Sequence, residues 1–289
     1  MEITAYKLNT FTKSGSGGNA AGVVLNADSL TENKMRKIAA ILGFSETAFV
    51  LQSDCADFKV RFFTPNEEIS LCGHATIATF FLLSSQGHIK PGSYLQETKA
   101  GVLPIEVQED LSIMMHQLIP NFGKAIDKQE IAHSLHITTD KIADDLPVQI
   151  VSTGINDIMV PIKSINILNA IQPDLKEIAQ ISKKYNVVGY HLFTLESLNH
   201  STAHCRNFAP LYEIPEESAT GTSNGALACY LYQHGKIDCE QAKNLVFEQG
   251  YSMEKPSEIV VSLSVKNKEI VTVKVGGKAL LSSIVEIEL

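Results

Sequence analysis

Hydrophobic residues recur along the chain with two spacings, one typical of β-strands and the other of α-helices. Apolar and polar positions alternate in segments such as 58–63, which predicts strands because successive strand side chains point to opposite faces. Strands are predicted at 3–8, 21–25, 46–51, 58–63, 94–96, 103–107, 113–117, 153–160, 192–195, 203–208, 260–265, 270–275 and 284–289. Helices are predicted between 29 and 43 and at 76–84, 129–135, 175–185 and 221–232.

The first predicted helix has clear boundary signals. Ser29 and Glu32 have the spacing of a capping box at a helix start, and Gly43 is a suitable residue to end the helix. Its buried face is predicted to consist of Met35, Ile38, Ala39 and Leu42. The next predicted strand begins at Glu46, so a carboxyl group lies at the start of a strand among apolar neighbours.

One short pattern occurs once in each half of the chain. The first copy is Arg61–Pro65, Cys72–Ala75 and an apolar run ending at Gly87, and the second is Arg206–Pro210, Thr220–Ser223 and an apolar run ending at Gly235. The two arginines are 145 residues apart, and the later features are 148 residues apart. We therefore expect two similar domains that face one another, with a site between them built from two equivalent turns.

The length of 289 residues allows two domains, each with its own core. We predict an N-terminal lobe at 1–118, completed by the C-terminal strand 279–289, and a C-terminal lobe at 119–278. The alternation of strands with two long apolar helices is typical of an α+β fold.

Composition and charge narrow the possible functions. The chain has 24 Lys and Arg against 32 Asp and Glu, a net charge of −8, and without a basic run nucleic-acid binding is disfavoured. No segment approaches the roughly 20 apolar residues of a membrane span, and the N-terminus lacks the pattern of a signal peptide. Five cysteines without a CxxC pair predict a reducing, cytoplasmic location rather than a disulfide framework or structural zinc.

Two glycines stand where a ligand could bind. Gly73 and Gly221 each lie at the start of a predicted buried helix, where backbone N–H groups lack partners within the helix and attract anions. The alternative is that each glycine only permits close packing. Because the arrangement occurs twice with matching strands upstream, we favour a site for a small carboxylate-bearing substrate.

Five segments resemble, in order and spacing, the phenazine-biosynthesis (PhzF-like) isomerase family. They are Gly18–Leu25, Gly43–Phe49, Arg61–Pro65, Cys72–Thr76 and Glu216–Thr222. The resemblance covers essentially the whole chain and implies a diaminopimelate-epimerase-like fold of two pseudo-symmetric lobes, each a mostly antiparallel sheet wrapped around a central helix. It also implies a proton shift, without cofactor or metal, on a cyclic amino-hydroxy acid related to anthranilate, and a homodimer.

The resemblance implies roles for individual residues. Glu46 matches the catalytic glutamate that moves the proton, and His74 matches the histidine beside it. Glu217 stands where the family usually has aspartate and is predicted to be a third catalytic residue. Substrate binding is predicted for Asn19, Gly73, Gly221 and Thr222. Ser218 replaces a proline and Thr222 replaces a serine, so this chain would keep the chemical groups of the pocket while changing its shape.

Elementary chemistry agrees with a proton-transfer role for Glu46. A general base works best when its pKa is near the operating pH, and burial beside Phe44, Ala48 and Phe49 is expected to raise the pKa of the Glu46 carboxyl. The alternatives to catalytic roles are that Glu46 is an ordinary glutamate at a strand end and that His74 is a packed histidine. Next to a second carboxylate, Glu217, we favour a proton relay.

The cysteines distinguish possible reactions within this fold. The epimerases and racemases of the fold that the resemblance implies are similar to one another in using a pair of cysteines, one at each turn, but here Cys72 is matched by Thr220. A threonine hydroxyl without activation is too weakly acidic to replace a thiol. Two-thiol epimerisation is therefore disfavoured, and Cys72 is expected to be a small packed residue. An amino-acid epimerase or racemase, and a non-catalytic small-molecule binder, remain alternatives to the isomerase.

Two other patterns are not assigned a ligand. The glycine-rich segment 14–19 lacks the Lys-Ser/Thr of a phosphate-binding loop and is interpreted as a loop before a strand. The pairs His133/His136 and His200/His204 have spacings that can present metal ligands, but no pattern of partner ligands accompanies them. We predict no metal and no cofactor.

Overall fold

The computed structural model describes residues 2–13, 15 and 17–289, so the glycine-rich segment falls partly outside the described residues. Contacts divide the chain into two compact units, Met1–His116 with Gly276–Leu289 (unit 1) and Gln117–Val275 (unit 2). The chain enters unit 2 within strand β8 (Ile113–Gln117) and returns within β17 (Glu269–Gly277). The division predicted from the sequence, an N-terminal lobe of 1–118 with strand 279–289 and a C-terminal lobe of 119–278, stays a prediction.

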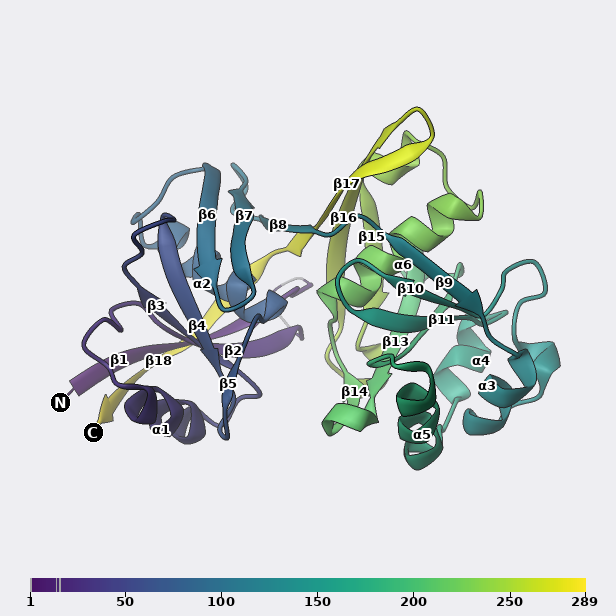
Figure 1. Ribbon diagram of the computed structural model, residues 1–289, viewed down its shortest axis with the longest axis horizontal. Coiled ribbons are helices and arrows are strands. Elements are labelled where there is room, and N and C mark those ends of the chain that lie inside the picture. The colour runs from purple at the N-terminus through teal and green to yellow at the C-terminus, as the bar shows by residue number, and fades with distance from the viewer. Residues whose placement is uncertain (1, 14, 16) are drawn as a thin grey trace. The chain divides into compact units, whose positions relative to one another are not determined.

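Unit 1 combines a sheet with helices (Figure 1). Its other strands are β1 (Glu2–Thr10), β2 (Asn19–Val24), β3 (Thr47–Leu51), β4 (Phe58–Phe63), β5 (Glu68–Ile69), β6 (Gly92–Thr98), β7 (Gly101–Val107) and β18 (Ala279–Glu288). The helices are α1 (Glu32–Leu42) and α2 (Gly73–Ser85). Strand β18 lies antiparallel beside β1, so the two ends of the chain meet in one sheet.

Helix α1 has the predicted buried face, but its start differs from the prediction. Met35, Ile38, Ala39 and Leu42 are buried, and Gly43 ends the helix with a positive φ of 69°. The N-cap is Thr31, however, so the capping box led by Ser29 is wrong. The reason is a turn in which Leu30 N donates to Ala27 O, because the backbone at Ser29 is still turning before the helix begins.

Helix α2 is buried on nearly every side, as its continuous apolar sequence predicts. It packs against β1, β2, β3, β7 and β18. Strand β3 separates two parts of the core: Phe49 packs in the cluster that includes α1, and Ala48 and Val50 pack in the cluster that includes α2. Both faces of β3 are therefore covered by apolar side chains.

Unit 2 repeats this order of elements with additions. Its strands are β9 (Asn121–Ala125), β10 (Gln149–Ser152), β11 (Asn156–Pro161), β12 (Gly189–Thr194), β13 (Ala203–Ala209), β14 (Ile214–Glu217), β15 (Leu245–Gln249) and β16 (Ser257–Lys266). Its helices are α3 (Lys128–Ser134), α4 (Ile165–Ala170), α5 (Leu175–Tyr185) and α6 (Gly221–Gln233). Short 3₁₀ turns occur at Thr139–Lys141, Pro210–Tyr212, Gln241–Lys243 and Tyr251–Met253. The sequence also predicts a crossover between the two domains at 120–123, but most of this segment lies in β9.

The sequence repeat corresponds to a repeat of strand pairing. In unit 1, β2 pairs parallel with β3, β3 antiparallel with β4, and β4 parallel with β6. In unit 2, β11 pairs parallel with β12, β12 antiparallel with β13, and β13 parallel with β15. Helix α2 precedes β6 and α6 precedes β15, so the two helices occupy the same place in the two patterns.

The protein is a mixed α/β, sheet-rich chain with six α-helices among the residues that the structure describes. In this same part of the chain, each helix is too short or too polar to cross a membrane.

Candidate active site

Glu46 is placed at the entrance to β3 by the pairing of the sheet. Its backbone carbonyl accepts a hydrogen bond from Gly22 N of β2 over 3.1 Å. Ala48 and Val50, which follow it by two and four residues, pack in the α2 cluster, and side chains two apart on a strand share a face. The Glu46 side chain therefore points to the face on which α2 packs, where it is 16% exposed.

His74 lies between Glu46 and Cys72 in the first turn of α2. Its Nε2 is 3.2 Å from Glu46 Oε2, and its Nδ1 is 3.4 Å from Cys72 Sγ. His74 and Cys72 are buried, with exposures of 8% and 7%. A carboxylate, an imidazole and a thiol thus form one group, here called the Glu46 cluster. Cys72 is packed, as predicted, but it also contacts the imidazole.

The pKa of Glu46 is shifted opposite to the sequence-based expectation. Burial alone would raise the pKa of this carboxyl, but the contact with His74 and the charge of His74 outweigh burial and lower it. Burial likewise would lower the pKa of His74, but Cys72 and the Glu46 carboxylate raise it well above its ordinary value. The expectation of a raised Glu46 pKa is therefore wrong, because it considered burial without the neighbouring imidazole. The geometry favours a carboxylate beside an imidazolium.

The other predicted residues of unit 1 lie at the same place. Asn19 Nδ2 is 3.5 Å from His74 Nδ1, so the start of β2 reaches the Glu46 cluster. Gly73 is the first residue of α2, and a Cβ placed there would meet Met115 Cε at 3.8 Å, which is ordinary contact. Packing therefore does not require glycine at position 73. Substrate binding by Asn19 and Gly73 stays a prediction.

The predicted residues of unit 2 gather around the start of α6. Thr220, the N-cap residue, donates from Oγ1 to Glu217 Oε2 over 2.5 Å. Gln249 Nε2 donates to the carbonyl of Glu217 over 2.7 Å. Gly221 is the first residue of α6, and the carbonyl of Thr222 accepts a hydrogen bond from Thr153 Oγ1 over 3.3 Å. Their roles in catalysis and binding stay predictions.

A buried polar network supports this turn, and sequence reasoning missed it. Its members come from β11, β12, β13, α6 and β15, and are Asp157, His191, Asn207, Ser223, Asn224 and Gln249. Asn224 Nδ2 donates to Thr220 O and to Gln249 Oε1 over 2.9 and 2.8 Å. The one sequence signal was a charged residue, Asp157, directly before the apolar run 158–160.

The contacts of this network determine the tautomer of His191. Because Asn224 Nδ2 donates elsewhere, its Oδ1 faces His191 Nε2 at 3.3 Å and must accept a proton from it. His191 Nδ1 is then the acceptor for Asn207 Nδ2 at 3.2 Å. The imidazole is therefore neutral. This agrees with its pKa, which burial lowers to about 4 although the hydrogen bond to Asn224 acts to raise it.

Asp157 lies at the end of the network, and the pKa of its carboxyl group is shifted. Asn207 Nδ2 also donates to Ser223 Oγ over 3.2 Å, and Ser223 Oγ donates to Asp157 Oδ2 over 2.6 Å. Burial raises the pKa of Asp157 to about 7, the hydrogen bond from Ser223 lowers it, and the charge of Glu217 raises it further. The first turn of α6 is thus held through Ser223 to a carboxyl group, Asp157, whose protonation changes near neutral pH.

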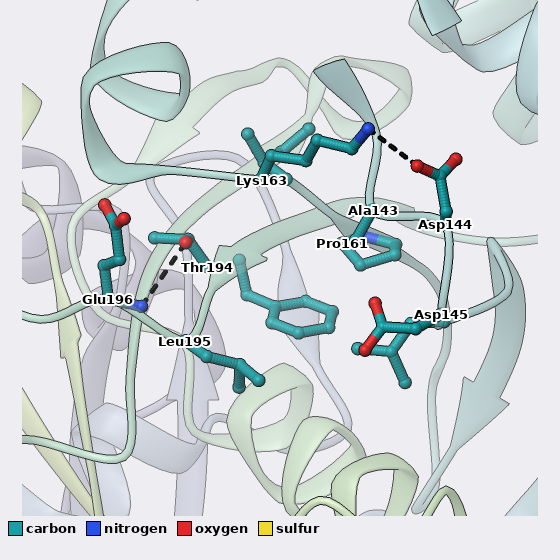
Figure 2. A pocket seen from close by; sticks show the side chains of 11 residues that line it. Ala143, Asp144, Asp145, Pro161, Lys163, Thr194, Leu195 and Glu196 are labelled. Atoms are coloured by element: carbon teal, nitrogen blue, oxygen red, sulfur yellow. Dashed lines mark hydrogen bonds and ion pairs between the residues drawn. The ribbon is translucent and has the colours of Figure 1, made fainter. Parts of the chain in front are cut away.

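Unit 2 also has a cavity of about 500 Å³ that contains none of the predicted site residues. Apolar side chains that include Pro161, Phe193 and Leu195 line it beside acidic ones (Figure 2). Asp144 pairs with Lys163 over 2.7 Å, and Thr194 Oγ1 accepts from Glu196 N. Asp145 pairs with Lys236, and Glu196 accepts a hydrogen bond from Ile165 N. The ionic groups at this cavity therefore have partners, and we assign no reaction to it.

Sequence comparisons match the chain over nearly its full length. The profile of the phenazine biosynthesis-like protein family matches residues 8–284. An uncharacterized isomerase of Clostridium acetobutylicum is 37% identical over 287 residues, covering 96% of this chain and 95% of that protein. The trans-2,3-dihydro-3-hydroxyanthranilate isomerase of Pseudomonas chlororaphis is 26% identical over 277 residues, covering 93% of this chain and 94% of that protein.

Solved structures show the same similarity. The phenazine biosynthesis protein of Bacillus anthracis, of the PhzF family, superposes with a TM-score of 0.90 at 32% identity and covers all of both chains. A hydroxyproline epimerase of Agrobacterium vitis superposes with a TM-score of 0.64 at 11% identity, covering 99% of this chain and 91% of that one. The second similarity shows a shared fold alone.

Proposed function

Since the chain belongs to the phenazine biosynthesis-like protein family, we propose that it is an isomerase. It moves a proton between two carbons of a small, cyclic, carboxylate-bearing metabolite, without a cofactor. The observation that carries this proposal is the pair of Glu46 and His74, whose Oε2 and Nε2 lie 3.2 Å apart at the start of a buried helix.

The two side chains supply complementary parts of the reaction. The Glu46 carboxylate takes a proton from one carbon and becomes a carboxylic acid, the double bond of the substrate shifts, and Glu46 returns the proton to the other carbon. The His74 imidazolium stabilises the carboxylate before the transfer. The N–H groups of the first turn of α2 attract the substrate carboxylate, because the helix dipole is positive there.

The family resemblance supports further assignments. We propose that each unit is a diaminopimelate-epimerase-like lobe and that Glu217 is a second acid–base group. Asn19, Gly73, Gly221 and Thr222 are the proposed substrate contacts. A cytoplasmic homodimer is the expected form of the protein, and light scattering of the purified chain would test the dimer.

Incorporation of solvent deuterium into substrate or product tests the proposal. The Pseudomonas relative is named for trans-2,3-dihydro-3-hydroxyanthranilate, so cyclic amino-hydroxy acids of this type are the first substrates to incubate in D₂O. We expect Glu46→Gln to slow incorporation by about 10²- to 10⁴-fold, the usual contribution of a general acid–base group. The exposed Glu67→Gln variant is the matched control, and equal rates for Glu46→Gln and wild type would refute the role of Glu46.

One observation favours a second candidate, an amino-acid epimerase or racemase. Cys72 contacts His74, and a thiol beside a titrating group suits proton transfer at a single carbon. Thr220 opposes this candidate, since its hydroxyl donates to Glu217 and replaces the second thiol. A non-catalytic binder would show thermal stabilisation by these ligands but no deuterium incorporation.

A further inference from the structure

We propose that Glu46, Cys72 and His74 bind a thiophilic divalent cation such as Zn²⁺, and that the bound ion reversibly blocks the isomerase. Binding follows from the geometry of the three side chains alone. The inhibitory effect rests on the proposed function, because the ion would occupy the carboxylate and imidazole that transfer the proton.

The separations of the donor atoms fit a tetrahedral zinc ion. Zinc lies about 2.3 Å from sulfur and roughly 2.0–2.2 Å from nitrogen and oxygen, so ligand atoms in a tetrahedron are roughly 3.3–3.6 Å apart. His74 Nε2 is 3.2 Å from Glu46 Oε2 and 3.8 Å from Cys72 Sγ. All three donors lie within 4.8 Å of one another, so small side-chain shifts would complete the site.

The donor set decides which ions would bind. Thiolate and imidazole favour zinc and related transition metals, whereas Mg²⁺ and Ca²⁺ prefer oxygen ligands. Three protein ligands leave one coordination position open, unlike the four of closed structural zinc sites. The ion is therefore expected to exchange and to be removed by chelators.

Two further features of the site suit an ion. Among the described residues, no donor is aligned for a hydrogen bond with the buried Glu46 Oε2, although His74 Nε2 is 3.2 Å away. An ion would satisfy this oxygen. If His74 binds through Nε2, its Nδ1 carries a proton, and the Asn19 amide 3.5 Å away could accept it after a flip of the amide.

Cobalt titration tests binding directly. The variant Cys55→Ser/Cys239→Ser removes the exposed cysteines and is the background for all measurements. We expect Co²⁺ to produce a thiolate-to-cobalt absorption band with tetrahedral d–d bands, displaced by Zn²⁺ and unaffected by Mg²⁺. Adding Cys72→Ser should abolish the charge-transfer band. Absence of the band from the background protein, or its persistence after Cys72→Ser, would overturn the proposal.

Two other variants test the ligand assignment if Cys72→Ser fails to fold. Glu46→Gln keeps the side-chain volume and is expected to weaken cobalt binding by at least about tenfold, and Asn19→Ala by about tenfold. Circular dichroism checks that each variant is folded. Unchanged cobalt affinity in both folded variants would contradict the site.

Deuterium incorporation measured with and without Zn²⁺ separates this inference from the proposed function. Exchange that stops with Zn²⁺ and recovers with chelator supports both. Cobalt bands without exchange on any substrate would support the metal site and remove the isomerase proposal. Exchange that is insensitive to Zn²⁺, in a protein without cobalt bands, would leave the isomerase and overturn the metal site.

Discussion

Ser223 donates a hydrogen bond from Oγ to Oδ2 of Asp157 over 2.6 Å and so ties the first turn of α6 to β11. Ser223 in turn accepts from Asn207, which also donates to His191. Asp157 has a pKa raised to about 7 and His191 a pKa lowered to about 4. The two groups therefore couple protons to folding with opposite signs.

Replacing Asp157 by Asn is expected to change how stability depends on pH. Between the ordinary pKa of 3.8 and about 7, folded Asp157 holds a proton that the unfolded chain has released, so this group lowers stability as pH rises. In Asp157→Asn this loss disappears. The free energy of unfolding relative to wild type should rise from pH 4 to 7, by up to about 1.4 kcal/mol per pH unit.

Urea denaturation at a series of pH values measures this slope. Asn retains an oxygen that accepts from Ser223, so the slope rather than the absolute stability is the readout. The exposed Asp54→Asn variant serves as the control. A difference between Asp157→Asn and wild type that is constant across pH would show that Asp157 does not hold a proton in the folded state.

Replacing His191 by Gln is expected to give the opposite slope. Between about 4 and the ordinary pKa of 6.5, the unfolded chain protonates His191 but the folded chain does not, so this group raises stability as pH rises. In His191→Gln the free energy of unfolding relative to wild type should fall from pH 4 to 6.5. Slopes of the same sign in His191→Gln and Asp157→Asn would refute the assigned protonation states.

Much of the fold followed from local patterns. The buried face of α1, its end at Gly43 and the full extent of α5 were predicted from apolar spacing and turn residues, and the structure confirms them. The repeat predicted that two segments share a strand–turn–helix order, which the matching strand pairings confirm. The cap at Ser29 was wrong because a turn through Leu30, whose side chain enters the core, delays the helix.

The site was less accessible to sequence reasoning. The contact between Glu46 and His74 joins residues 28 positions apart, and the family resemblance, rather than periodicity, predicted it. The direction in which the Glu46 pKa shifts could not be predicted without knowing how close the imidazole lies. The Asp157 network could not be predicted, because its members lie on five elements that meet only after the sheet of unit 2 has formed.

The pH dependence of deuterium incorporation should report the Glu46–His74 pair. Glu46 must be ionised, and its pKa is lowered from 4.5, so activity is lost only as pH falls below about 4.5. His74 must be protonated, and its pKa is raised well above 6.5, so activity is lost on the alkaline side well above that pH. We expect kcat/KM to be constant at least from pH 4.5 to 6.5.

The variant His74→Gln tests whether the alkaline limb of the profile reports His74 or an ionisable group of the substrate. Removing the imidazole should abolish the alkaline limb of the profile. It should also move the acid limb to higher pH, because the positive charge of His74 no longer offsets the burial that raises the pKa of the Glu46 carboxyl. His133→Gln, at an exposed histidine, is the control. An unchanged alkaline limb in His74→Gln would assign that limb to another group.

The relative effects of Cys72→Ser and Glu46→Gln separate the proton shuttle from two-thiol epimerisation. A shuttle through Glu46 loses about 10²- to 10⁴-fold in Glu46→Gln. Cys72→Ser should cost far less, since burial raises the pKa of the Cys72 thiol and disfavours its ionised form. An enzyme that uses thiols would reverse this order and would be inactivated by alkylation. Initial rates of deuterium incorporation at saturating and at low substrate decide between the two mechanisms, with Cys55→Ser as the control. Loss of the reacting base lowers kcat, whereas a disturbed pocket mainly raises KM.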